Sequence, residues 1–298
     1  MDLFGGIEAG GTKFVCAVGD ANGDIQDKIT IATTTPAETI SKVIKYFQAM
    51  HTKRPLSALG VASFGPIDLE PGSKYYGYIT TPPKTQWKLF DFVGTMRRAL
   101  NLPCGWDTDV NGAALGEHYF GAAQDCDTFI YVTVGTGIGV GGMVSGKLMH
   151  GLVHPEMGHI FIPHDRTKDD FAGVCPFHGD CLEGLASGPA INKRWDVATC
   201  SELPSEHPAW DLETDYLAIA FANYTLMLST QKIIVGGGVM RNRILLPKIR
   251  TKVQTLLNGY ISHEKILNQM DQYIVVPGLG EQSGICGALA LAQTKGNK

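Results

Sequence analysis

The spacing of apolar residues changes along the first half of the chain and marks out its expected elements. Residues 3–18 contain two short apolar runs joined by Gly10 and Gly11, which predicts a β-hairpin, and a third strand is expected near residues 25–31. From Pro36 onward apolar side chains recur at helical spacing, so we expect an amphipathic helix that starts at this proline. Beyond it we expect strands at 59–69 and 103–110 and helices at 90–100 and 112–120.

The second half of the chain opens with the same pattern as the first. Residues 129–144 again read as strand, glycine-threonine turn and strand, which is a weak internal repeat. Such a repeat suggests a duplicated architecture with a cleft between two halves. The other elements expected here are strands at 233–240 and 273–276 and helices at 190–198, 210–228, 246–257 and 283–292. Because strands and helices alternate, the chain is predicted to have an α/β fold.

Composition narrows the class of protein. The chain has 298 residues, of which 44% are hydrophobic and 18% are charged, and a formal net charge of −4, which describes an ordinary globular protein of two expected domains. The basic residues are scattered, so we expect no nucleic-acid partner. No apolar run approaches the roughly 18 residues of a membrane helix, and residues 1–11 lack the pattern of a signal peptide. We therefore expect a cytoplasmic protein with no membrane partner.

The cysteines point to a metal site. There are seven, an odd number without a dense framework, which fits reduced thiols and a bound metal better than disulfides. Cys175, His178 and Cys181 have the spacing C-x2-H-x2-C, so three soft ligands can converge on one ion within a single loop. Tetrahedral zinc needs a fourth ligand. We favour His159 for that position, while His154 and His164 remain open.

Two glutamates, Glu156 and Glu183, flank the ends of this predicted zinc loop. A zinc ion with four protein ligands has no open position, so its expected task is to hold the loop, and with it both glutamates, in a fixed shape. Convergent polar groups of this kind more often serve a ligand than a core. The competing interpretation is a solvated loop with incidental cysteines.

Three glycine-rich turns follow expected strands, at residues 9–13, 135–139 and 236–238. Glycine lets backbone N–H groups approach a phosphate where a Cβ would block them, and Lys13 adds a positive charge beside the first turn. Each turn alone is also explained by a tight hairpin, but three together favour a nucleotide ligand. Residues 137–142 fit G-x-G-x-x-G without the helix that a dinucleotide site requires, and the P-loop pattern does not occur.

Asp109 lies where an expected strand meets the following helix. Catalytic groups of open α/β sheets project into the crevice from such positions. The competing role for this carboxylate is to cap the helix. Asp107 is the nearest rival for a catalytic role, and the Asp-Thr-Asp cluster alone does not separate the two.

These motifs together resemble the ROK family of sugar kinases, and within it the bacterial fructokinases. The most specific part of the resemblance is E-x-G-H followed by the Cys/His knot, and the matched segments run in order from residue 8 to about residue 290. The segments are EAGGTK at 8–13, DTDVNGAALGE at 107–117, VGTGIGVG at 134–141, HPEMGH at 154–159, CPFHGDCLEG at 175–184 and VGGGVM at 235–240.

The resemblance implies the actin-like, ribonuclease H-like ATPase fold, in which two lobes close on ATP and a hexose. The expected lobes are residues 1–118, joined by the helix 283–298, and residues 119–282, which carry the zinc loop. It implies ATP-dependent phosphorylation of a hexose, fructose foremost, with mannose or glucose as alternatives. A non-DNA-binding sugar sensor is a further alternative, whereas a repressor is not expected because the first glycine turn starts at residue 9 and leaves no room for a helix-turn-helix. We also expect a homodimer.

The resemblance also assigns roles to single residues, with ATP, Mg²⁺ and Zn²⁺ as the implied cofactors. Asp109 is the implied general base that takes the proton from the attacking sugar hydroxyl. The residues implied at ATP are Gly10, Gly11, Thr12, Lys13, Thr136, Gly137, Gly237 and Gly238. Those implied at the sugar are Gly65, Pro66, Thr108, Asp109, Glu156, His159 and Glu183, and His159 is also an implied zinc ligand with Cys175, His178 and Cys181.

Three features depart from the commoner family pattern. Glu8 stands where much of the family has Asp, so its metal or phosphate role is open. Thr108 stands where many members have Asn, which leaves its sugar contact open. The knot has C-x2-H-x2-C in place of C-x-C-x4-C, a pattern that still satisfies zinc.

Overall fold

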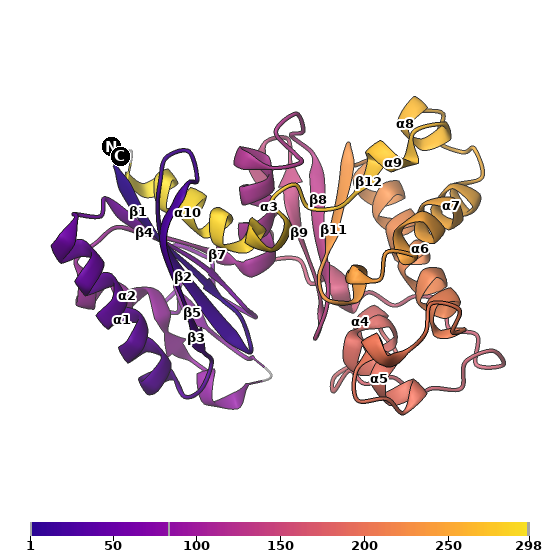
Figure 1. Cartoon of the computed structure of the whole chain (residues 1–298), viewed down its shortest axis with the longest axis horizontal. Helices are drawn as coiled ribbons and strands as arrows, with labels where there is room; N and C mark the ends of the chain where they lie inside the picture. The colour runs from indigo at the N-terminus through magenta and orange to yellow at the C-terminus, as the bar shows by residue number, and fades with distance from the viewer. Residues whose placement is uncertain (1, 83, 297–298) are drawn as a thin grey trace.

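The chain folds into two halves, each built on a five-stranded β-sheet (Figure 1). We describe it from a computed structural model, in which residues 2–82 and 84–296 are described. The first sheet has the order β3-β2-β1-β4-β7. Its strands β1, β2 and β3 are antiparallel, while β4 and β7 run parallel to β1. These strands are β1 (Leu3–Ala9), β2 (Lys13–Asp20), β3 (Ile25–Ala32), β4 (Ala58–Ser63) and β7 (Cys104–Thr108).

The second sheet repeats this arrangement strand for strand. Its order is β10-β9-β8-β11-β12, with β8, β9 and β10 antiparallel and with β11 and β12 parallel to β8. The repeat predicted from the two glycine-turn hairpins is therefore present in the fold. These strands are β8 (Phe129–Val134), β9 (Ile138–Val144), β10 (Lys147–Leu148), β11 (Lys232–Gly236) and β12 (Ile274–Val275).

Helices complete each half. In the first half, α1 buries Ile40, Val43 and Phe47 as their spacing predicts, and Thr35 caps its first turn. The elements here are α1 (Pro36–Lys53), α2 (Phe92–Leu100) and the short strands β5 (Tyr78–Ile79) and β6 (Phe90–Asp91). The second half contains α4 (Leu182–Ala186), α5 (Gly188–Trp195), α6 (Ala209–Leu228), α7 (Leu245–Leu257), α8 (Glu264–Leu267) and α9 (Met270–Tyr273). Its core joins α6 and α7 to strands β8, β9 and β11.

Two helices, α3 (Asp109–Phe120) and α10 (Ser283–Gly296), lie where the halves meet (Figure 1). Helix α10 comes after the second half in the chain but packs on β1, β4 and β7 of the first. It approaches β4 so closely that Gly60 has no room for a Cβ beside the Ala288 carbonyl, and Gly287 likewise touches Gly112 of α3. Small residues therefore allow this helix to close the first half.

Several element boundaries differ from those predicted. The strand expected at 59–69 ends at Ser63, and the one expected at 233–240 ends at Gly236 because Gly237 has a φ of 98°. Helices α4, α8 and α9 were not predicted, since four or five residues are too few to show a helical period.

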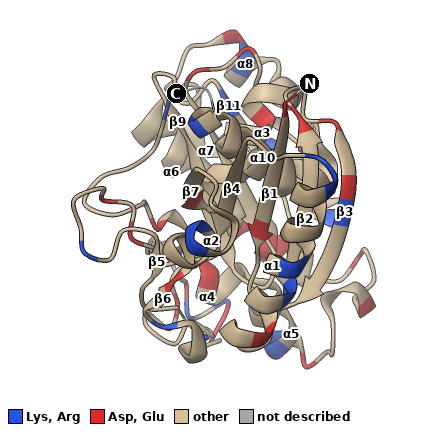
Figure 2. Cartoon of the chain, turned by 90° about the vertical axis from the view of Figure 1, so that its left-hand side faces the viewer, with Lys and Arg blue, Asp and Glu red and all other residues tan. Residues whose placement is uncertain are grey.

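Acidic and basic residues are interspersed on the side that carries α1 and α2 (Figure 2). No helix in the described part of the chain combines the length and apolarity needed to cross a membrane.

Candidate active site

Asp109 lies at the junction between the two halves, as the first residue of α3. Thr108 rather than Asp109 caps the helix, because its hydroxyl accepts a hydrogen bond from the Asn111 N–H at 3.1 Å. Asp109 is partly exposed, and among the described residues its carboxylate accepts hydrogen bonds from backbone N–H groups alone, that of Val110 at 2.9 Å. Burial of the carboxyl group raises the pKa of Asp109 to about 6. Asp109 thus offers a carboxylate with unused acceptor sites.

Asp107, the other candidate for a catalytic carboxylate, is buried, and its oxygens contact neighbouring side chains. It is 2% exposed, accepts from the Asn111 side chain at 2.8 Å, and lies 2.8 Å from Nε2 of His150. That contact raises the pKa of His150. Thr108 is also buried, at 4% exposure, and its hydroxyl oxygen serves α3. The sugar contact expected of Thr108 stays a prediction.

Four carboxylates gather around the junction. Burial raises the pKa of Glu8 to about 7, and the negative charge of Asp109 adds to the effect while Lys13 opposes it. Burial likewise raises the pKa of Glu156 to about 7, helped by the charges of Asp109 and Glu183. Mutual repulsion of this kind favours a bound cation, and a hard divalent ion such as Mg²⁺ prefers carboxylate oxygens.

The first glycine turn, Gly10 to Lys13, presents an open face beside these carboxylates. Thr33 holds the carbonyl groups of this turn in place. Its hydroxyl donates to the Gly10 carbonyl at 2.8 Å, and its N–H donates to the Thr12 carbonyl at 2.9 Å. Among the described residues, the one atom within 4 Å of a Cβ built on Gly11 is Cε of Lys84, at 4.0 Å. Thr33 and Lys84 were not predicted, because both reach the turn from distant parts of the sequence.

The second and third glycine turns lie together at the ends of β8 and β11. A Cβ on Gly135 would lie 3.7 Å from the Gly238 nitrogen. Gly238 itself is exposed, and no described atom lies within 4 Å of a Cβ built on it. At Gly137, by contrast, a Cβ would lie 2.5 Å from the Glu183 carboxylate, which accepts the Ile138 N–H at 2.9 Å. A carboxylate therefore already occupies part of the second turn.

The predicted sugar residues come from both halves. Gly65 and Pro66 follow β4, and the Pro66 carbonyl accepts hydrogen bonds from both the N–H and the hydroxyl of Thr80, at 2.8 and 3.0 Å. His154 packs against this loop, and its Nε2 accepts the Ile67 N–H at 3.1 Å. His154 is thus engaged in the loop rather than in the cysteine cluster.

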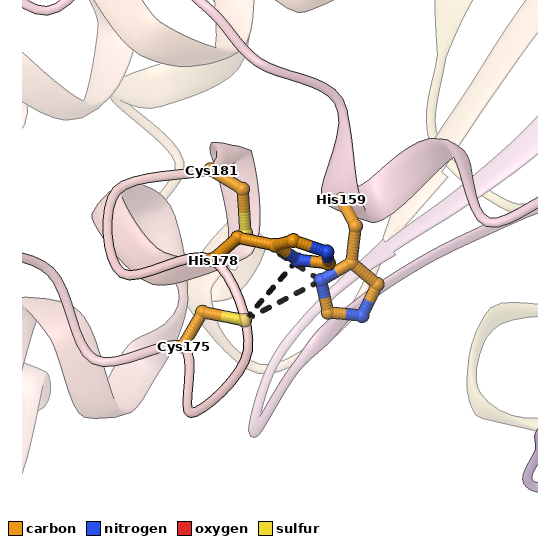
Figure 3. Close-up of side chains that lie close together, drawn as sticks. All are labelled: His159, Cys175, His178 and Cys181. Carbon is orange, nitrogen blue, oxygen red and sulfur yellow. Dashed lines mark hydrogen bonds between the residues drawn. The ribbon is translucent and has the colours of Figure 1, made fainter.

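The cysteine and histidine side chains predicted to bind zinc converge (Figure 3). Ligand atoms of His159, Cys175, His178 and Cys181 all lie within 4.8 Å of one another. Nδ1 of His159 is 3.7 Å from Sγ of Cys175 and 3.5 Å from Sγ of Cys181, and Nδ1 of His178 is 3.6 Å from Sγ of Cys175. Ligands at zinc bond lengths in a tetrahedron lie roughly 3.5 Å apart, so this cluster fits the ion.

His164, the other open alternative for the fourth ligand, lies in a separate network. Its Nδ1 is 3.0 Å from a carboxylate oxygen of Asp180, and its Nε2 is 2.8 Å from the Asp169 carbonyl. Asp169 in turn pairs with Arg194 at 3.1 Å and accepts the Tyr216 hydroxyl at 2.6 Å. This network ties the loop between His159 and Cys175 to α5 and α6.

His159 connects the cysteine cluster to Glu183. While its Nδ1 faces the sulfurs, its Nε2 lies 3.9 Å from the nearer oxygen of Glu183. A histidine that binds metal through one ring nitrogen commonly directs the other toward a carboxylate. Glu183 therefore lies next to the cluster while it is hydrogen-bonded to the second glycine turn.

Comparison with known proteins settles the family. The sequence profile of the ROK family matches residues 4–295. The chain belongs to the ROK family. Two relatives are likewise similar to this chain over nearly its whole length. A putative fructokinase of Bacillus subtilis is 48% identical over 97% of this chain and 95% of its own length, and a fructokinase of Pediococcus pentosaceus is 47% identical over 98% of both.

Solved structures of ROK proteins share the fold at low sequence identity. A ROK family glucokinase from Streptomyces griseus, in complex with glucose and AMPPNP, has a TM-score of 0.76 at 23% identity and covers 98% of this chain and 99% of its own. The ROK hexokinase from Thermus thermophilus has a TM-score of 0.77 at 22% identity and covers 98% of both chains. The actin-like fold predicted from the sequence is therefore confirmed.

Proposed function

We propose that this protein is an ATP-dependent fructokinase, which transfers the γ-phosphoryl group of ATP to a hydroxyl of fructose to give fructose 6-phosphate. The observation that carries the proposal is the Asp109 carboxylate, free of the helix cap and placed between the two halves beside Glu8 and Glu156. Relatives named fructokinases, at 41 to 48% identity over nearly the whole chain, support fructose as the acceptor.

Asp109 is the proposed general base. Its pKa of about 6 leaves it mostly ionised at neutral pH, yet makes it a stronger base than an ordinary aspartate. It orients the acceptor hydroxyl and takes its proton as the oxygen attacks phosphorus. Glu156 and Glu183 accept hydrogen bonds from other hydroxyls of the sugar, since an ionised carboxylate has several acceptor sites. Gly65 and Pro66 border the same pocket.

The glycine turns and lysines are assigned to ATP. The open face of Gly10, Gly11 and Thr12 borders the phosphates, and Lys13 supplies positive charge. The N–H groups directed at the phosphates are those of Gly11 and Thr12, because the Gly10 N–H donates to the Lys13 carbonyl at 3.0 Å. Thr136 and Gly137 approach from the second half, and Gly237 and Gly238 border the adenosine. Glu8 is the carboxylate that would help to hold Mg²⁺, which when bound would neutralise charge on the phosphates.

Zinc is assigned to structure. His159, Cys175, His178 and Cys181 supply four ligands, so the ion has no open position for substrate. Bound there, it fixes the loop that carries His159 and the start of α4, where Glu183 lies.

We further propose that one lobe comprises residues 1–118 with 283–298 and the other residues 119–282. We also propose that the protein forms a homodimer, which light scattering at micromolar protein concentration tests.

The test is sugar-dependent release of ADP by the purified protein with Mg-ATP, measured for fructose, mannose and glucose. We expect kcat/KM for fructose to exceed the values for mannose and glucose by at least about tenfold. A preference for glucose or mannose would retain a hexose kinase but replace its substrate. Fructose binding without ADP release would favour the sugar sensor.

A further inference from the structure

His154 occupies a position between the two halves that the proposed reaction has not yet used. Its side chain is 5% exposed and belongs to the second half, yet its ring contacts the loop after β4 in the first. Glu156 lies two residues away in the same segment. A buried imidazole that touches both sides of a binding cleft can fix their relative positions.

The hydrogen bond from Ile67 determines the state of the ring. The Ile67 N–H donates to Nε2 at 3.1 Å, so Nε2 carries a lone pair and not a proton. In a neutral ring the proton then resides on Nδ1, which lies 3.4 Å from Oε1 of Glu156. Burial lowers the pKa of His154, in keeping with a neutral ring.

The loop is shaped to this ring. A Cβ on Gly65 would lie 3.2 Å from Cε1 and 3.3 Å from Nε2 of His154, closer than side chains ordinarily pack. Ile67 is itself buried, at 2% exposure, and pairs with Ile79. The loop therefore rests on the 78–80 segment on one side and on the imidazole on the other.

We propose that His154 is a positioning residue for the sugar, because one ring accepts the Ile67 N–H of the Gly65–Ile67 loop through Nε2 and brings Nδ1 to 3.4 Å from the Glu156 carboxylate. The proposal rests on the proposed function, in which the loop and Glu156 both face the hexose. His154 does not touch the reacting atoms. It sets the distance between two groups that bind the same substrate from opposite sides.

The test compares His154→Ala with His154→Gln, whose amide oxygen can replace Nε2 as the acceptor for Ile67. We expect His154→Ala to raise KM for fructose about tenfold, with kcat and KM for ATP within about twofold. His154→Gln should recover most of the lost affinity. A tenfold change that falls on kcat, or a glutamine variant no better than alanine, would overturn the proposal.

His51→Ala is the matched control. In the last turn of α1, Nδ1 of His51 accepts the Leu56 N–H at 3.0 Å, which is the same kind of bond placed in another part of the first half. Its loss should lower Tm without a change in KM for fructose. If both alanine variants lower Tm alike and neither changes KM, His154 is a packing residue only.

A measurement without turnover separates this proposal from the kinase assignment. Nitrogen-15 NMR of histidine-labelled wild type reports the tautomer directly. We expect the Nδ1–H form for His154 at pH 7, and the Nε2–H form or a charged ring would overturn the proposal. Absence of ADP release by wild type with any hexose would instead overturn the kinase function.

Discussion

The two halves share one strand order, yet their hairpin turns have different surroundings. The first turn, Gly10 to Lys13, is fixed from behind by Thr33 and leaves Gly11 facing open space beside the Lys84 side chain. The second turn, Gly135 to Gly137, has the Glu183 carboxylate against Gly137 and bonded to the Ile138 N–H. The first hairpin turn thus has lysine side chains at its open face, whereas the second has a carboxylate bonded to it.

The comparison shows that the local sequence determines the conformation of each turn. Side chains from distant parts of the sequence determine the charge around it, and with that the ligand it can bind. Glycine permits both hairpins, but a turn flanked by lysine attracts a polyanion and one flanked by a carboxylate repels it. We therefore expect the first turn to carry most of the phosphate binding. We expect Thr136 and Gly137 of the second turn to contribute less to the phosphates, and the turn to hold Glu183 in position for the sugar.

The largest effect is expected from removing the Asp109 carboxylate, which lies between the halves. Asp109→Asn keeps the size of the side chain but removes the base, so kcat should fall about 1,000-fold with little change in either KM. Steady-state ADP release measures this. The exposed Asp170→Asn is the control and should behave as wild type. A fall of less than tenfold would exclude Asp109 as the base.

A pair of glycine substitutions tests the two turns directly. In Gly11→Ala the new methyl group enters open space, so Tm should stay within about 2 °C of wild type while kcat/KM for ATP falls about 100-fold. In Gly137→Ala the methyl group displaces Glu183, so KM for fructose should rise about tenfold and KM for ATP much less. Equal losses in ATP binding from both substitutions would show that the turns are equivalent.

Loss of zinc should act on the second half alone. Cys181 is fully buried, and Cys181→Ser removes one of the four proposed ligands. We expect no bound zinc by mass spectrometry, a Tm lower by about 5–10 °C, and a several-fold rise in KM for fructose, while KM for ATP changes little. The buried Cys286→Ser lies outside the cluster and is the control. Metal-free wild type with unchanged Tm would contradict the assignment.

The last effect concerns the dependence of kcat on pH. A general base acts only when ionised, and because burial raises the pKa of Asp109 to about 6, the active form is lost as the pH falls through 6. Between pH 7 and pH 5 we expect kcat to fall about tenfold. The residual rate of Asp109→Asn should lack this dependence. A wild-type rate that stays flat down to pH 5 would place the relevant pKa elsewhere.

Much of the fold was predictable because its signals are local. The hairpins, the helix at Pro36 and the repeat all follow from spacing within windows of fewer than twenty residues. The cysteine spacing likewise predicted the cluster in which His159 now lies beside Cys175 and Cys181. Short helices and strand ends were missed, because packing rather than periodicity decides them.

The site could be predicted only where its residues lie within motifs. Asp109 was predicted as the base from its place before a helix, with a helix cap as its competing role. The structure shows that Thr108 is the cap, a distinction that depends on side-chain rotamers. Lys84 and Thr33 reach the first turn across long stretches of sequence. His154 accepts a hydrogen bond from Ile67, which lies 87 residues away in the sequence. Because this partner is distant, no local pattern could have shown that His154 is not a zinc ligand.

The close seating of α10 against β4 has a consequence for how the protein is made. Residues 283–296 cover the first sheet but leave the ribosome after the whole second half. Until then the apolar face of β1 and β4 has no permanent cover, and the closing contacts span more than 200 residues of sequence, which slows folding. The half that is synthesised first is thus completed last, and its sheet stays exposed for longest during translation.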